Sequence, residues 1–357
     1  MAPAKIKSFQ RVANRMPDLD ATPSSGRQRI GIDVSKGKLD VAVLDERDKI
    51  KSHVFANDSK GHAALITWLE QRGCGAQLAQ VCLEATGCYS ESIATALVDA
   101  GWQVSVVNPA RVKGFAQSEL MRNKTDRADA ALLARFGQAL HPEPWIAPPV
   151  EVRQLRALVD RLQSLKEMHQ QEVNRLEGAT NRSGTRKSIE SHLQWLQQSI
   201  QQLERQINDH IDVHPGLRDD AKLISSIPGV GKATAAKVIA YLGDVRRFKN
   251  AKALAAFIGV TPRLKLSGSS VRGRSMISRS GHAEMRRSLY MPALVALKHN
   301  PIIKTFGVRL RATGLAPKAV VAASMHKLVH LIYGILKSGT PFTANFMVAS
   351  LDIQDGI

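Results

Sequence analysis

The stretch Arg29-Ile-Gly-Ile-Asp-Val-Ser-Lys-Gly-Lys-Leu-Asp-Val-Ala-Val-Leu44 decides the fold of the first half of the chain. Its apolar runs predict two strands, 30–34 and 38–44, joined by a tight turn through Lys36-Gly37. Asp33 lies inside the first apolar run, where a carboxylate without a partner is costly to bury. We therefore expect Asp33 either to cap the turn through its own backbone or to be the first ligand of a metal site.

The order of the elements predicted after this hairpin indicates an α/β fold. Apolar patterning predicts, in order, a strand at 50–56, a helix at 60–73, a strand at 78–83, a helix at 89–101 and a strand at 103–107. An antiparallel hairpin sheet that is extended by parallel strands and flanked by helices is typical of the ribonuclease-H-like fold. We assign residues 27–148 to this first domain.

Three further carboxylates are expected beside Asp33. Glu84 follows the fourth strand, which neighbours the first strand in this fold, and Asp126 and Asp129 project from one face of a helix start. Taken alone, a helix start favours acids, with Asn123 as its cap. Four converging carboxylates would repel one another unless cations neutralised them. The pattern therefore predicts two-metal phosphodiester cleavage with Mg²⁺, for which Mn²⁺ can substitute.

The composition indicates a polyanionic partner. The 357 residues include 50 Lys and Arg against 31 Asp and Glu, a net charge of +19, and 44% of them are hydrophobic, enough for two domains. We expect no membrane association, because no uninterrupted apolar run approaches about 20 residues and no apolar leader opens the chain. Three cysteines are too few for a disulfide framework, so we expect a cytoplasmic protein. Residues 1–26 are predicted to be a disordered basic tail.

A helical linker is predicted at 149–212. Leucine, isoleucine and methionine recur there at alternating three- and four-residue spacing, in two arms separated by the polar break at 181–186. Such arms form either a coiled coil that dimerises two chains, the interpretation we favour, or a helical hairpin within one chain.

The second domain, predicted at 213–345 and followed by a tail at 346–357, has two signs of DNA binding. Pro228-Gly229-Val230-Gly231 and Lys232 match the turn of a helix-hairpin-helix motif, whose backbone N–H groups can hold a phosphate. The alternative is an Ala-rich helix after an ordinary Pro-Gly turn. A basic surface suited to phosphate is also expected here and beside the acidic helix start. Its expected contacts are Arg122, Lys124, Arg263, Lys265, Arg272, Arg274 and Arg279.

The basic loop also carries three serines, Ser267, Ser269 and Ser270. Their spacing alone assigns chemistry to none of them, and His282 is only a weak candidate base because no His–Asp pair accompanies it. A closing amphipathic helix is predicted at 315–337.

Taken in order, the motifs resemble one family. They are Gly31-Ile-Asp-Val-Ser-Lys36, Leu83-Glu-Ala-Thr-Gly87, Arg122-Asn-Lys-Thr-Asp-Arg-Ala-Asp129, Ile227-Pro-Gly-Val-Gly231, Gly259-Val-Thr-Pro262 and Ser267-Gly-Ser-Ser-Val-Arg-Gly273. Together they resemble the DEDD-type transposases of the insertion-sequence one-ten family over residues 28 to 340.

This resemblance implies a RuvC-like domain with the tetrad Asp33, Glu84, Asp126 and Asp129, and a mainly helical transposase domain in which Ser267 is the nucleophile. It also implies a noncoding bridge RNA that pairs with donor and target DNA, a tetramer built from dimers, and a nucleoid-associated protein of the bacterial cytoplasm. Three alternatives remain: a RuvC-like nuclease or Holliday-junction resolvase that uses water, an actin- or sugar-kinase-like ATPase, and a non-catalytic RNA-binding scaffold.

Overall fold

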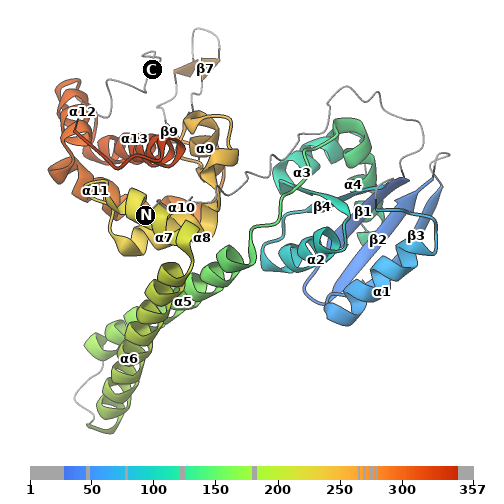
Figure 1. The fold of residues 1–357 in the computed structure, drawn as a ribbon, viewed down its shortest axis with the longest axis horizontal. Coiled ribbons are helices and arrows are strands. Elements are labelled where there is room, and N and C mark those ends of the chain that lie inside the picture. Colours follow the sequence, from blue (N-terminus) through green and yellow to red (C-terminus); the bar gives the residue numbers. More distant parts are fainter. Residues whose placement is uncertain are drawn as a thin grey trace, which may run out of the picture. The chain divides into compact units, whose positions relative to one another are not determined.

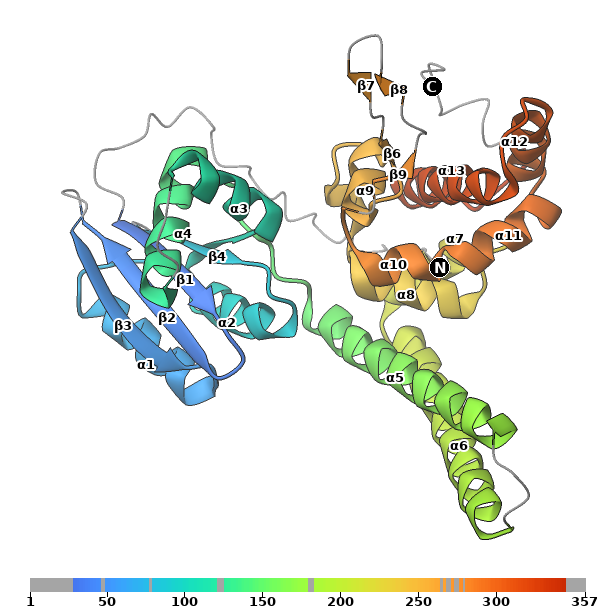
Figure 2. The ribbon, with the colours of Figure 1, turned by 180° about the vertical axis from the view of Figure 1, so that it is seen from behind.

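The computed structural model describes residues 28–45, 49–76, 79–120, 125–178, 183–263, 266–267, 271–272, 276–278 and 280–344. The chain divides into two compact units, Met1–Ala147 and Pro148–Ile357, and each is described by itself (Figures 1 and 2). The predicted tails lie outside the described residues, as do five of the expected basic contacts: Arg122, Lys124, Lys265, Arg274 and Arg279.

The first unit is built on one five-stranded mixed sheet, in the order β3-β2-β1-β4-β5. Its strands are β1 (Gln28–Val34), β2 (Lys38–Leu44), β3 (Ile50–Ala56), β4 (Ala79–Glu84) and β5 (Gln103–Val107). The β1–β2–β3 part is antiparallel, whereas β4 pairs in parallel with β1 and with β5. The five predicted strands and the mixed sheet are therefore confirmed, while the RuvC-like assignment stays an expectation.

Helices cover both faces of this sheet (Figures 1 and 2). On one face α1 (Ser59–Glu70) and α2 (Cys88–Asp99) enclose the larger apolar core, which includes Ile30, Leu65 and Leu97. On the other face lie α3 (Pro109–Ser118) and α4 (Asp126–Leu140). We did not predict α3, although Asn108, whose side chain accepts the N–H of Ala110, and Pro109 are a usual helix start.

The second unit begins with two long helices that pack against each other within the chain, α5 (Val150–Gly178) and α6 (Ser183–Val213). Heptad residues of both arms are buried in one core, and Lys166 Nζ lies 2.7 Å from Glu204 Oε1 across the pair. A helical hairpin, our less favoured alternative, is thus present in the single chain. Dimerisation through this region stays a prediction.

The rest of this unit is mainly helical. It comprises α7 (Pro215–Ser225), α8 (Lys232–Leu242), the 3-10 helix η1 (Val245–Arg247), α9 (Ala251–Ile258), α10 (Ala283–Ser288), α11 (Tyr290–His299), α12 (Pro301–Ala312), α13 (Pro317–Ser338) and two short ladders, β6 (Pro262–Arg263) with β9 (Met276–Ile277) and β7 (Leu266–Ser267) with β8 (Val271–Arg272). The predicted closing helix is α13, which is long and apolar enough to cross a membrane. However, 61% of its most apolar window is buried in this unit, as in a core helix.

Candidate functional site

The strand register gathers carboxylates on the sheet face that α4 covers. Asp33 of β1 lies opposite Asp40 of β2, and the pairing of Ile32 with Leu83 brings Glu84 of β4 level with Asp33. Side chains alternate along a strand, so these three acids share the face of Gly31, which packs against α4. The acids come from three neighbouring strands at the end where β1 runs into its turn.

The helix α4 lies very close to this face because small residues meet there. A Cβ added at Gly31 would lie 1.9 Å from the carbonyl oxygen of Ala130 and 2.5 Å from the nitrogen of Ala134. At Gly137, an added Cβ would lie 3.1 Å from Cβ of Cys82. Backbone therefore packs directly on backbone, and the first turn of α4 is held beside the carboxylates of the sheet.

That first turn supplies the other two acids of the predicted tetrad. Asp126 and Asp129 both lie in the first turn of α4, as predicted. The helix is capped by Thr125, which immediately precedes the first helical residue and whose hydroxyl accepts the N–H of Ala128 at 3.2 Å. Asn123, the cap that we considered, lies outside the described residues.

The β1–β2 turn is closed by a side chain other than that of Asp33. Its closing hydroxyl belongs to Ser35, which donates to the carbonyl oxygen of Lys38 at 2.9 Å and accepts the N–H of Lys38 at 3.3 Å. The alternative in which Asp33 caps this turn through its own backbone is therefore not what the structure shows.

The electrostatics of Asp33 show that the acids lie near one another. Burial, followed by repulsion from Asp129, Asp126, Asp40 and Glu84, raises the pKa of Asp33 from 3.8 to about 6. Every acid of the predicted tetrad thus contributes, together with Asp40, which we did not predict. The sequence did contain a signal for Asp40, because a two-residue turn at Lys36-Gly37 pairs position 33 with position 40.

One lysine partly neutralises this cluster. Lys38 Nζ lies 2.5 Å from Asp126 Oδ2 and 3.1 Å from Asp40 Oδ2, and the hydrogen bond to Asp126 is the main cause that raises the pKa of Lys38. Lys38 therefore ties the start of β2 to the first turn of α4. We did not predict this contact.

The donor chemistry fits a hard divalent cation, since all five acids offer carboxylate oxygens. Within the described part of the chain, however, no three Asp, Glu, His or Cys side chains meet closely enough to form a metal-ligand group. These two observations are consistent. The acids share one face and are close enough to raise the pKa of Asp33, but their oxygens do not converge on one point.

In the second unit, the predicted helix-hairpin-helix turn lies between α7 and α8. Gly229 has a φ of +103°, and an added Cβ would lie 2.8–2.9 Å from atoms of Ala296 in α11. Gly231 is instead exposed at the start of α8, where no side chain caps the helix, and Lys232 beside it is also exposed. The structure thus gives the two glycines different surroundings, one packed against α11 and one at an open helix start.

The remaining predicted residues of this unit lie in or near the short ladders. Arg263 is exposed in β6, and the backbones of Ser267 and Arg272 lie in β7 and β8, where Ser267 pairs with Val271. The weak candidate base, His282, is the N-cap of α10: its Nδ1 accepts the N–H of Met285 at 3.2 Å, and burial lowers its pKa. A ring nitrogen used in this way is a poor general base.

Comparisons with known proteins cover both units. Residues 30–182 match a family model described as Transposase, and residues 221–307 match one described as Transposase IS116/IS110/IS902 family. The chain is 31% identical to the pilin gene-inverting proteins of Moraxella lacunata and Moraxella bovis, over 88% of this chain and 97% of theirs. It is 23% identical to the transposase for insertion sequence element IS1111A of Coxiella burnetii, over 76% of this chain and 78% of that protein.

Proposed function

The chain belongs to the IS110/IS116/IS902 family of transposases and is a DNA transposase or recombinase. From this we propose that it cuts and rejoins DNA with a serine nucleophile and a metal-binding tetrad, under the guidance of a noncoding RNA. The observation that carries the proposal is the gathering of Asp33, Glu84, Asp126 and Asp129 on one face of the sheet, where burial and the neighbouring acids raise the pKa of Asp33. An ATPase would leave both family matches unexplained.

The tetrad would hold the divalent cation that DEDD transposases generally use. We propose Mg²⁺, with Mn²⁺ able to replace it, because carboxylate oxygens suit both ions. When bound, the cation would neutralise charge on phosphoryl oxygens and lower the pKa of an attacking hydroxyl. Such a cation would also favour the ionised form of Asp33, whose pKa is raised by burial and by the neighbouring acids.

Ser267 is the proposed nucleophile. Its Oγ would form a bond to a DNA phosphorus while the bond from that phosphorus to one deoxyribose oxygen breaks. The serine loses its proton, and the released sugar oxygen gains one. The opposite exchange, with a sugar hydroxyl from another strand, rejoins DNA and restores the serine. The basic residues predicted around the loop and at the start of α8 would hold the flanking phosphates.

Two substitutions test these roles separately. Asp33→Asn should keep DNA binding and lose cleavage. The wild type should form a covalent protein–DNA species on denaturing gels, and Ser267→Ala should not. A Ser267→Ala variant that cuts at the wild-type rate would replace this mechanism with hydrolysis by water, as in a nuclease or junction resolvase. An Asp33→Asn variant that keeps every activity would indicate a non-catalytic scaffold.

The proposed assembly includes RNA and further copies of the chain. The net charge of +19 suits two kinds of nucleic acid, and we propose that the RNA pairs with donor and target DNA while the chains form dimers and then a tetramer in the bacterial cytoplasm. Sequencing the RNA that copurifies with the protein tests the first point. Light scattering with and without DNA tests the second, and a monomer under both conditions would contradict it.

A further inference from the structure

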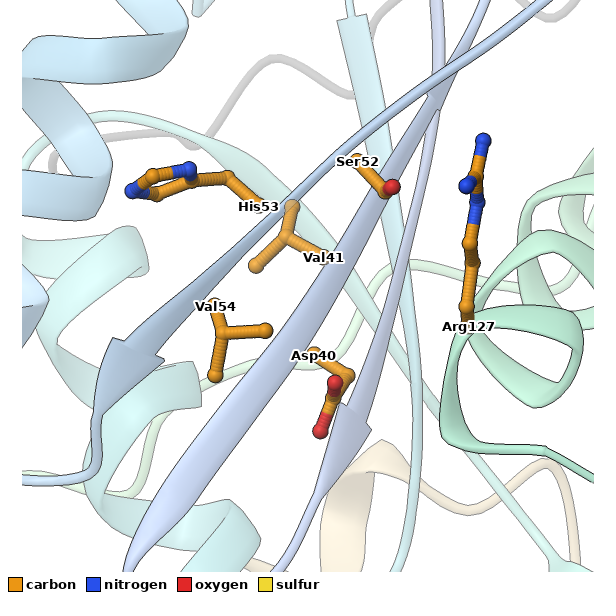
Figure 3. A pocket seen from close by; sticks show the side chains of 6 residues that line it. All are labelled: Asp40, Val41, Ser52, His53, Val54 and Arg127. Atoms are coloured by element: carbon orange, nitrogen blue, oxygen red, sulfur yellow. The ribbon is translucent and has the colours of Figure 1, made fainter.

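A hollow lies beside the carboxylate cluster, at the edge of the sheet in the first unit. It measures about 360 Å³, and we call it the edge hollow. Its lining residues are Asp40, Val41, Ser52, His53, Val54 and Arg127 (Figure 3). It adjoins the proposed tetrad because Asp40 lies opposite Asp33 and Arg127 directly follows Asp126.

The hollow exists because α4 does not extend across the whole sheet. The helix packs on β1, β2 and β4, whereas β3 is an edge strand that α1 packs against. Val54 of β3 consequently has 53% of its surface exposed. A sheet edge next to the proposed catalytic site offers an apolar surface and open access for an extended DNA strand.

Arg127 supplies a positive charge to this hollow. Its side chain is exposed and forms no hydrogen bond or ion pair with any residue in the described part of the chain. Figure 3 shows it beside the strands, on the side toward which Ser52 points, while His53 points to the opposite side. Lys38, unlike Arg127, already forms ion pairs with Asp126 and Asp40. Arg127 is thus a cation that lines the edge hollow together with Asp40 and pairs with none of the carboxylates described.

We propose that the edge hollow binds the DNA nucleotide next to the cleaved phosphate. Arg127 and the Ser52 hydroxyl would bind the phosphate of that nucleotide, and its sugar would lie on Val54. This inference rests on the proposed function, because a strand cut at the tetrad must continue past one side of it. A guanidinium that binds a phosphate through paired donors carries no sequence information in that contact, so it positions DNA of any sequence.

The test measures binding of the full chain to a labelled DNA duplex from the end of its own element, in EDTA so that nothing is cut. Arg127→Met should lower the slope of log affinity against log salt by about 0.9, the effect of one lost phosphate contact. Arg127→Lys should keep the slope. The matched control is Lys60→Met, which removes an exposed charge from α1 on the other face of the sheet. Equal slopes for Arg127→Met and the wild type would overturn the proposal.

A second series locates the contact. In each duplex one phosphate near the cut is replaced by a neutral methylphosphonate. The wild type should lose about tenfold in affinity at one linkage beside the cut, and Arg127→Met should be insensitive there and nowhere else. Identical profiles for the two proteins would overturn the proposal, as would sensitivity at no linkage beside the cut.

These readouts do not depend on cleavage. If the proposed chemistry is wrong, Asp33→Asn will not alter cutting, yet the Arg127-dependent linkage will still be found. If only this inference is wrong, Asp33→Asn will abolish cutting while the two methylphosphonate profiles coincide. Thermal unfolding of each variant checks that a lost contact is not a lost fold.

Discussion

Replacing Gly31 with alanine should disable the site without touching a carboxylate. The added Cβ would lie 1.9 Å from the carbonyl oxygen of Ala130 and 2.5 Å from the nitrogen of Ala134, whereas carbon and oxygen normally approach to about 3.3–3.6 Å. Both atoms are backbone, so α4 must withdraw by more than about 1 Å. Asp126 and Asp129 move with it. Overpacking of this kind costs about 1–3 kcal/mol, and a displacement of about 1 Å at a reacting centre can lower the rate about 100-fold.

The assay compares Gly31→Ala with Gly37→Ala, in the turn of the same hairpin. An added Cβ at Gly37 meets nothing within 4 Å, so the control should keep both its stability and its activity. For Gly31→Ala, we expect the melting temperature to fall by roughly 3–10 °C and DNA cleavage to fall about 100-fold. The reasoning fails if Gly31→Ala cuts DNA like the control, because α4 would then not set the position of the acids.

Three further predictions follow from buried contacts. The pKa of Asp33 is about 6 in the folded state and 3.8 ordinarily, so without a metal the free energy of unfolding should rise as pH falls from 6 to 3.8. In EDTA, Asp33→Asn should flatten the melting-temperature profile over this pH range. An unchanged profile would argue against the cluster. Asn300→Ala should lower the free energy of unfolding by about 1–2 kcal/mol, because this fully buried side chain accepts hydrogen bonds from the N–H groups of Ile302 and Ile303. Urea unfolding measures this, and an unchanged midpoint would contradict it. Gly229→Ala should destabilise the second unit, measured by the same unfolding, because φ is +103° and Ala296 blocks a Cβ; similar stability in the two proteins would show that the turn can shift.

The proposed guide RNA, serine chemistry and assembly all involve nucleic-acid partners. The hairpin that α5 and α6 form also bears on the assembly. The apolar faces that a dimerising coiled coil would use are already partly buried within one chain, so a dimer would form through the surfaces that remain. Among the described residues of these two helices, the exposed large apolar side chains are Val150 and Met168 on α5 and Trp195 and Val213 on α6.

Much of the first unit could be predicted from the sequence, because the signals are local. Apolar runs predicted the two strands of the first hairpin, and the glycine between them predicted the turn. The acids of the first turn of α4 followed from their i, i+3 spacing. Strand order then followed from the sequence of elements, so the proximity of Glu84 to Asp33 could be predicted as well.

Only the tertiary structure decided which other residues join them. The turn sequence already implied that Asp40 lies opposite Asp33, but Lys38 reaches Asp126 only because α4 lies directly on Gly31. Gly229 packs against α11 while Gly231 stays exposed, a difference that the turn sequence does not contain. Patterning along the chain reports which face a side chain takes, but contact between segments far apart depends on how closely their backbones can approach, and that distance is set by packing across the whole unit.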